Sequence, residues 1–158
     1  MASCEELITY DQRGGEHRFF LFADNRGFVE LHEVIFFVSS TDTWPPPDGH
    51  YYELAIRKFN ESTVQTTQME NHDHAELRGK GITEALIPEI SRRLQRDVLS
   101  SPEYRDNSDR RTVHATKVWE RLVSRGVAVR EGDRYRVNYS TARQQAMRRT
   151  SDDTPGLR

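Results

Sequence analysis

The chain has 158 residues, of which 35% are hydrophobic and 30% are charged, and its formal net charge is -2. This length fits one domain with a core of its own, and the aromatic content argues against a chain that is disordered throughout. The slightly negative charge disfavours a dedicated nucleic-acid binder, although arginines gather in the second half.

The single cysteine, Cys4, allows no intramolecular disulfide, which is typical of a reducing compartment. No apolar run approaches the roughly 20 residues that a membrane-spanning helix needs, and no secretory leader is visible. We therefore expect a cytoplasmic protein that does not insert into a membrane.

The first half of the chain has the pattern of antiparallel strands. Residues 6–10 form a short strand or lead-in, and four further strands, rich in β-branched and aromatic residues, are expected over 18–23, 28–38, 50–59 and 63–70. The first two of these four pair as a hairpin. Three consecutive prolines make a stiff loop between the second and the third of these four strands, and Trp44 in this loop is expected to pack onto the domain and hold the loop in place.

Asn71-His72-Asp73-His74 follows the last of these strands. Two histidines around an aspartate suggest metal ligands, but no third and fourth ligand stands at a supporting spacing. The sequence therefore predicts a solvated loop here and no metal site.

The next segment places two glycines directly ahead of an amphipathic helix. Gly79 and Gly81 permit a sharp turn and a close approach of the backbone to a ligand, and the first amides of the helix have no intrahelical acceptor. Together with Arg78 and Lys80, these amides predict a phosphate-binding loop. A plain surface loop is the alternative, and the spacing fits neither a Walker A loop nor a dinucleotide fingerprint.

Helix and strand alternate beyond the glycines. A helix with Pro88 inside it is predicted over 82–96, and a short strand over 98–101 is expected to pair parallel with 63–70 through a β-helix-β crossover. Thr112 or Ser108 is expected to cap a second helix.

The apolar stripe of that second helix comprises Val113, Val118, Leu122 and Val123, with Trp119 alongside. A hairpin of residues 127–130 and 134–137 follows. Residues 1–139 are thus predicted to form one domain, and residues 140–158, which are polar and Arg-rich, a disordered tail.

The motif Arg78-Gly79-Lys80-Gly81-Ile82-Thr83 resembles the acyl-CoA loop of the GNAT superfamily of N-acetyltransferases, Gln/Arg-x-x-Gly-x-Gly/Ala at the start of a helix. Thr83 replaces the family's last small residue. The resemblance covers roughly residues 70–137, but the family's usual pantetheine-contacting Asn and general-acid Tyr are replaced by Thr112 and Trp119. Two helices that normally help to form the acceptor site are also missing.

The resemblance implies an α+β fold with a mostly antiparallel twisted sheet around a β-loop-helix-β acyl-CoA-binding unit. It implies transfer of an acetyl or other acyl group from acetyl-CoA, or another acyl-CoA, to an amine. The implied cofactor-binding residues are Arg78, Gly79, Lys80, Gly81, Ile82, Thr83 and Thr112.

For catalysis, the resemblance implies Glu70 or His72 as the base, acting directly or through a water. It implies a proton donor among Ser100, Ser101, Tyr104 and His114, of which Ser101 is our candidate. The Trp44 loop is the candidate replacement for the missing acceptor helices. The identity of the amine, the acyl preference and the oligomeric state are left open.

Two other functions compete with this one. A relative that keeps the fold but has lost the chemistry would bind CoA or a partner without catalysis. Residues 115–137 also resemble the end of a winged-helix DNA-binding module, although the net charge and the lack of two helices upstream disfavour it.

Overall fold

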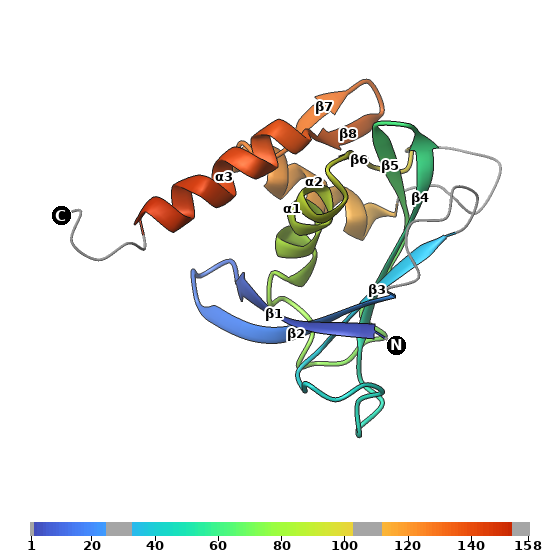
Figure 1. The fold of residues 1–158 in the computed structure, drawn as a ribbon, viewed down its shortest axis with the longest axis vertical. Helices are drawn as coiled ribbons and strands as arrows, with labels where there is room; N and C mark the ends of the chain where they lie inside the picture. Colours follow the sequence, from blue (N-terminus) through green and yellow to red (C-terminus); the bar gives the residue numbers. More distant parts are fainter. Residues whose placement is uncertain (1, 25–32, 103–111, 153–158) are drawn as a thin grey trace.

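The structure is a computed structural model and describes residues 2–24, 33–102 and 112–152. Within these residues eight strands form one open, mostly antiparallel sheet, accompanied by three helices (Figure 1). The strand order is β1-β2-β3-β4-β5-β6-β8-β7. The predicted class, α+β with a mostly antiparallel sheet, is therefore confirmed.

The first five strands pair antiparallel in chain order. They are β1 (Ala2–Tyr10), β2 (Glu16–Asp24), β3 (Val34–Ser39), β4 (Tyr52–Asn60) and β5 (Thr63–Glu70). β1 is longer than the predicted strand of residues 6–10. Within it Leu7 and Thr9 are buried while Ile8 between them is exposed, which is the alternation of a half-buried strand. The predicted start of β3 at residue 28 lies outside the described residues.

The chain then crosses over through α1 (Ile82–Leu94) to β6 (Asp97–Leu99), which pairs parallel with β5. This confirms the predicted β-helix-β crossover. The terminal hairpin of β7 (Val129–Glu131) and β8 (Arg134–Val137) joins the same sheet, since β8 lies between β6 and β7. The hairpin is therefore an integral part of the sheet rather than a free wing.

The second helix, α2 (Val113–Ser124), begins at Thr112, whose hydroxyl oxygen accepts a hydrogen bond from the Ala115 amide at 3.1 Å. Thr112 is thus the cap, and Ser108 lies outside the described residues. The predicted apolar stripe was wrong at Val113, which is 77% exposed. The buried face instead repeats at helical spacing through Ala115, Val118, Trp119 and Leu122, and Val113 lies off that face.

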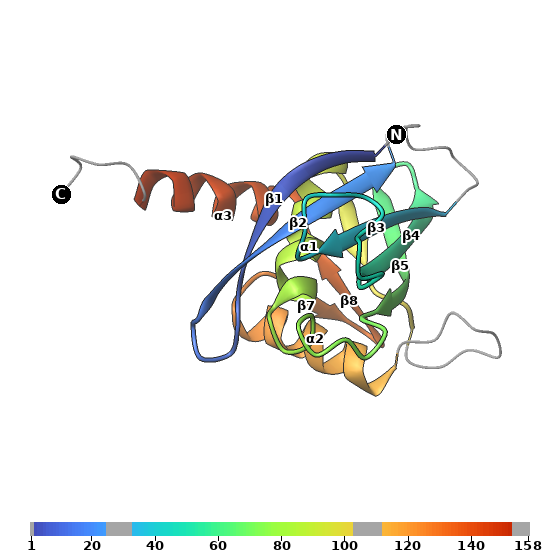
Figure 2. The same ribbon diagram turned by 90° about the horizontal axis from the view of Figure 1, so that it is seen from below.

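A third helix, α3 (Tyr139–Asp152), corrects the predicted disordered tail over the part of it that is described. Its start is anchored, because the Tyr139 amide donates to Asp97 at 2.8 Å and Arg92 Nη1 donates to the Ala142 carbonyl at 3.3 Å. Ala142 is fully buried. The rest of α3 extends away from the sheet (Figure 2). Residues 153–158 lie outside the described residues.

The core lies between the sheet and the first two helices, around fully buried Leu86, Ile90 and Trp119. Trp44 packs against the rings of Phe22, Phe37 and Tyr51, which confirms its predicted role as an anchor for the proline loop. None of the helices in the described part of the chain is long and apolar enough to cross a membrane. No helix precedes α1 in that part either.

Candidate functional site

A cleft of about 650 Å³ opens where β5 and β6 separate. β5 pairs with β6 only over residues 63–65, so no strand of the described residues covers that edge of β5 over residues 66–70, which line the cleft. The N-terminal turn of α1 and one face of α2 form the other walls. Pockets for small ligands commonly measure roughly 300–1,000 Å³, so the cleft is large enough for a small molecule or part of a larger one.

Ser101 lies at the point where the two strands part. Its hydroxyl group is buried and donates to the Thr66 carbonyl at 2.5 Å. This bond gives a hydrogen-bond donor to a backbone oxygen of β5 at a position where β6 no longer pairs with it. Ser101 lines the cleft as predicted, but its proton is held by the backbone.

The glycine loop leads into α1 at the wall of the cleft. Gly81 is the N-cap at φ 78°, and no side chain caps the helix. Ile82, Thr83 and Glu84, which supply the first helical amides, all line the cleft. An uncapped helix N-terminus carries partial positive charge and free N–H donors, which suits an anion.

Gly81 has a structural role in addition to the approach to a ligand that the sequence predicts. A Cβ at this position would lie 2.1 Å from the carbonyl oxygen of Tyr10, the last residue of β1. The neighbouring Lys80 carbonyl accepts a hydrogen bond from Thr9 Oγ1 at 2.5 Å. The loop is therefore fastened to the end of β1, and Gly81 is required for that contact. At Gly79, with φ 65°, a Cβ would meet nothing within 4 Å.

Thr83 stands on the cleft wall, and its hydroxyl group is already engaged. Thr83 Oγ1 lies 2.7 Å from the hydroxyl group of buried Tyr52, which also lines the cleft. Burial raises the pKa of Tyr52 far above its usual value, so the phenol stays protonated. The pair thus forms a neutral, hydrogen-bonded part of the wall.

Trp119 forms the α2 side of the cleft. It is fully buried and stacks on Tyr135 with ring centroids 6.0 Å apart. Its indole nitrogen is buried and has no hydrogen-bond acceptor among the described residues. A buried N–H without a partner costs about 1–3 kcal/mol, and the described residues leave this donor of a cleft-lining side chain unsatisfied.

Positive charge surrounds the α1 end of the cleft. Arg121 is neutralised by Glu84, with Nε 2.5 Å from Oε1. Lys80, Lys117 and Arg125 also line the cleft, and none of them forms an ion pair with a described residue. Lys80 lies on the glycine loop, Lys117 lies on α2, and Arg125 follows the last residue of α2.

Acidic groups lie at the other end, where β5 finishes. Glu70 lines the cleft with half of its side chain exposed, and its Oε1 is 3.8 Å from His72 Nδ1. His72 Nε2 is 2.9 Å from Glu53 Oε1, close enough for an ion pair but outside hydrogen-bond geometry. A carboxylate and an imidazole at a cleft mouth can accept a proton from an incoming group.

The structure thus brings most of the sequence-predicted site residues to one cleft. Those that line it are Glu70, Gly79, Lys80, Gly81, Ile82, Thr83, Ser101 and Thr112. His72 and Arg78 do not line it, and Arg78 is exposed. Sequence reasoning missed Tyr52, Lys117 and Arg125. Lys117 lies on the second predicted helix and Arg125 is its C-cap, so the positive charge of this helix beside Trp119 was the available signal.

Comparison with protein-family models, with curated proteins and with solved structures finds no match to this chain. The function is therefore argued from the cleft.

Proposed function

We propose that the protein is an acyl-CoA-dependent N-acyltransferase, which moves an acetyl or other acyl group from the thioester to an amine. The observation that carries this proposal is the position of the cleft, between two parallel strands that separate and beside the uncapped N-terminus of the helix that connects them. The resemblance to the GNAT superfamily implies a β-loop-helix-β unit, and the arrangement of β5, α1 and β6 supports the proposal in this respect.

The pyrophosphate of the cofactor would bind at the α1 end. The first-turn amides supply N–H donors, and Lys80 supplies a mobile charge directly beside them. Lys117 and Arg125 approach from α2 and suit the remaining phosphate charge. Arg78, which the sequence favoured for this role, is left out because it does not line the cleft.

The pantetheine arm would lie along the uncovered edge of β5. Amide groups in the arm can pair with backbone groups of residues 66–70, as a further strand would. The Trp119 indole N–H offers a donor to one carbonyl of the arm, at the position where the family usually has Tyr. Thr112, at the family's Asn position, lines the same wall with its hydroxyl oxygen occupied by the helix cap.

Transfer requires a base for the amine and a proton for the leaving thiolate. The amine nitrogen attacks the thioester carbon, the C–N bond forms, the C–S bond breaks, and the amine proton passes to Glu70 directly or to His72 through a water. Ser101 is a poor proton donor because its hydroxyl group is held by Thr66. His114, an exposed titratable group on the cleft wall, is the better candidate to protonate the thiolate.

Two observations favour a second function, a CoA-binding protein without catalysis. Indole N–H groups donate hydrogen bonds but do not titrate, so Trp119 cannot act as a general acid. The absence of any helix before α1 in the described residues also leaves no acceptor lobe of the kind the family has. Binding without turnover is the outcome that would support this alternative.

Calorimetric titration with acetyl-CoA, followed by release of free thiol in the presence of a panel of amines, tests both functions. Binding with thiol release supports the transferase, and binding without release for every amine class supports the second function. No binding at millimolar acetyl-CoA contradicts both.

Charge variants test the orientation of the cofactor. Lys80→Ala should weaken acetyl-CoA about 10- to 100-fold, as expected for a charge-assisted bond to phosphate, and leave acetyl-pantetheine unchanged. Arg78→Ala is the matched control, since it removes a neighbouring cation that lies off the cleft. Equal losses for the two ligands would show that Lys80 does not contact phosphate.

A further inference from the structure

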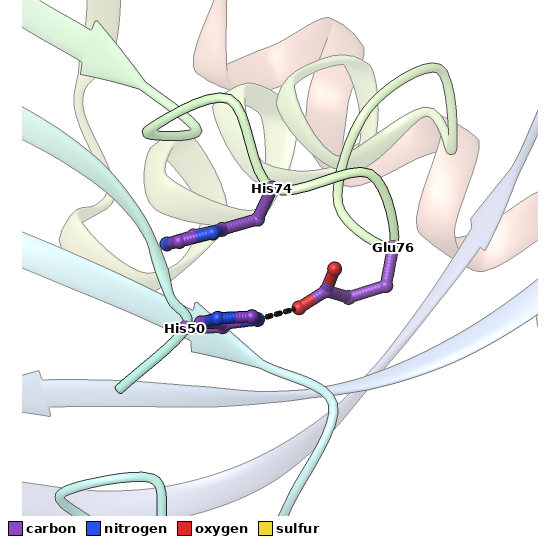
Figure 3. Close-up of side chains that lie close together, drawn as sticks. All are labelled: His50, His74 and Glu76. Carbon is purple, nitrogen blue, oxygen red and sulfur yellow. Dashed lines mark hydrogen bonds and ion pairs between the residues drawn. The ribbon is translucent and has the colours of Figure 1, made fainter. Parts of the chain in front are cut away.

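Three potential metal ligands gather outside the cleft, beside the beginning of β4 (Figure 3). His50 stands two residues ahead of β4, and His74 and Glu76 belong to the loop between β5 and α1. One ligand atom from each lies within 4.8 Å of the others. None of the three lines the cleft.

We propose that His50, His74 and Glu76 bind a divalent transition-metal ion of the zinc type. Zinc takes imidazole nitrogen and carboxylate oxygen at roughly 2.0–2.2 Å, and three protein ligands with an open fourth position make a complete site. The sequence suggested no such site because His50 is remote from His72-Asp73-His74 along the chain. Pairing of β4 with β5 brings it next to the loop.

The ligand pair His50 and Glu76 is already in contact. His50 Nδ1 is hydrogen-bonded to Glu76 Oε1, along the line drawn in Figure 3. An ion bound by both atoms would replace the proton that they share. Asp48, with Oδ2 3.7 Å from His50 Nδ1, adds a negative charge that favours a cation.

Hydrogen bonds of backbone amides hold the two chain segments that carry these side chains in place without a metal. The His50 amide donates to Asp48 Oδ1 at 2.8 Å. In the loop, the His74 amide donates to the Asn71 carbonyl at 3.2 Å, and the Leu77 amide donates to the His74 carbonyl at 3.0 Å. Only side-chain rotation is then needed to complete the site.

The stacking of the His50 and His74 rings is the reason that a rotation is needed. Their rings lie 3.8 Å apart with an angle of 13° between planes. An ion in the plane of one ring lies outside the plane of the other, so binding must turn at least one ring about its Cβ–Cγ bond. His50 and Glu76 are each 38% exposed, which leaves room for this movement and a path for the ion.

A second group, Glu53, Glu70 and His72, also has metal-ligand spacing. We favour the first group because two imidazoles suit zinc-type ions better than one imidazole with two carboxylates, which suits harder ions. The second group also includes Glu70, which lines the cleft. The two groups make different predictions for His72.

An ion at His50, His74 and Glu76 would tie the loop of residues 71–77 to β4. Since this loop runs directly into the glycines ahead of α1, the ion would stabilise the folded state by binding to it selectively. The inference does not depend on the proposed acyltransferase activity.

The test uses the full chain without an affinity tag, treated with chelator and then titrated with Zn²⁺ against a chromophoric chelator of known affinity. We expect one ion per chain and a higher melting temperature in excess Zn²⁺. His50→Ala and His74→Ala should each weaken binding by more than about 100-fold, which exceeds the 10- to 100-fold cost of losing an outer partner. Glu76→Gln, which keeps the side-chain shape, should weaken it in the same direction.

Two controls separate this site from other sources of binding. His72→Ala should bind Zn²⁺ as tightly as the unchanged chain, and loss of binding in this variant alone would place the ion in the second group and overturn the proposal. Cys4→Ser removes the exposed thiol, another zinc ligand, and should also leave binding unchanged. Absence of stoichiometric binding, or binding by the His50→Ala or His74→Ala variant as tight as that of the unchanged chain, would overturn it as well.

Discussion

The two ends of β5 lie in opposite surroundings although they belong to one strand. Thr63, Val64 and Gln65 lie between β4 and β6 and are buried, whereas Gln68 and Glu70 have β4 on one side only and are exposed. The difference arises because β6 has only three residues and β5 has eight. A crossover strand shorter than its parallel partner therefore creates a cleft without any inserted segment.

The polar groups at the two ends differ in the same way. At the closed end Arg136 donates to Asp97 and to Thr63 at 3.0 and 3.2 Å, and Arg134 donates to Gln65 at 3.0 Å. At the open end the buried Trp119 N–H has no acceptor among the described residues. The polar side chains at the closed end are thus paired within the protein, and the open end keeps a buried donor that no described residue pairs.

The largest effect is expected at Gly81, where the glycine loop packs against the end of β1. Gly81→Ala places a methyl group 2.1 Å from the Tyr10 carbonyl and forces a positive φ on a residue with a side chain. Such strain alone costs about 1–3 kcal/mol, and the clash adds to it, so we expect a loss of more than about 3 kcal/mol in the free energy of unfolding. Urea denaturation measures it.

Gly79→Ala is the matched control. The backbone there also has a positive φ, of 65°, but the added methyl group meets open space, so we expect a loss of only about 1–2 kcal/mol. If the two variants were equally stable, the contact between the loop and β1 would not explain the glycine at position 81. Close approach of the backbone to a ligand, the role predicted from the sequence, would then be the remaining explanation.

The next effect concerns Ser101, at the point where the strands part. Ser101→Ala leaves the buried Thr66 carbonyl without its 2.5 Å hydrogen bond, which should cost about 1–3 kcal/mol. Ser62→Ala, at an exposed turn, should change the free energy of unfolding by less than about 0.5 kcal/mol. A loss of thiol release with no loss of stability in Ser101→Ala would instead indicate the catalytic role suggested by the sequence.

These positions show what the sequence could and could not predict. Strand pattern and turn residues located β5 and the crossover, because alternation and glycine spacing are local signals. The contact of Gly81 with Tyr10 joins residues far apart in the chain, and so does the approach of His50 to His74. No local pattern carries such a contact. α3 was missed because one buried alanine in a polar segment leaves almost no periodic signal.

A smaller effect is expected at Trp119, and it addresses the ligand directly. Trp119→Phe keeps an aromatic ring against Tyr135 and removes the unpaired N–H, so a small loss of packing is offset by the loss of an unsatisfied donor. One neutral hydrogen bond contributes about 0.5–1.5 kcal/mol, so the Kd for acetyl-CoA should rise about 2- to 10-fold. Calorimetry on the folded variant measures it.

The partner ring supplies the control for this variant. Tyr135→Phe removes a hydroxyl group that donates a hydrogen bond to Glu120 and keeps the ring that stacks on Trp119. Tyr135 does not line the cleft, so acetyl-CoA affinity should be unchanged while stability falls. Unchanged affinity in Trp119→Phe would mean that the indole N–H does not contact the cofactor.

The smallest effect is a pH dependence at the β1–β2 turn, whose residues Tyr10 and Gln12 line the cleft on either side of Asp11. A hydrogen bond from His17 and another from the Gly15 amide hold the pKa of Asp11 at about 2, below its ordinary 3.8. Because the folded state favours the carboxylate, the contribution to stability is complete above about pH 4 and is lost as pH falls through 2.

Asp11→Asn removes this titration. The difference in unfolding free energy between the unchanged chain and Asp11→Asn should therefore shrink as pH falls from 4 to 2, and it should be small at every pH because the carboxyl is solvated and screened. Parallel stability curves over this interval would show that the turn does not hold the carboxylate. The end of β1 would then be held against the glycine loop by the hydrogen bond from Thr9 Oγ1 to the Lys80 carbonyl rather than by the hairpin turn.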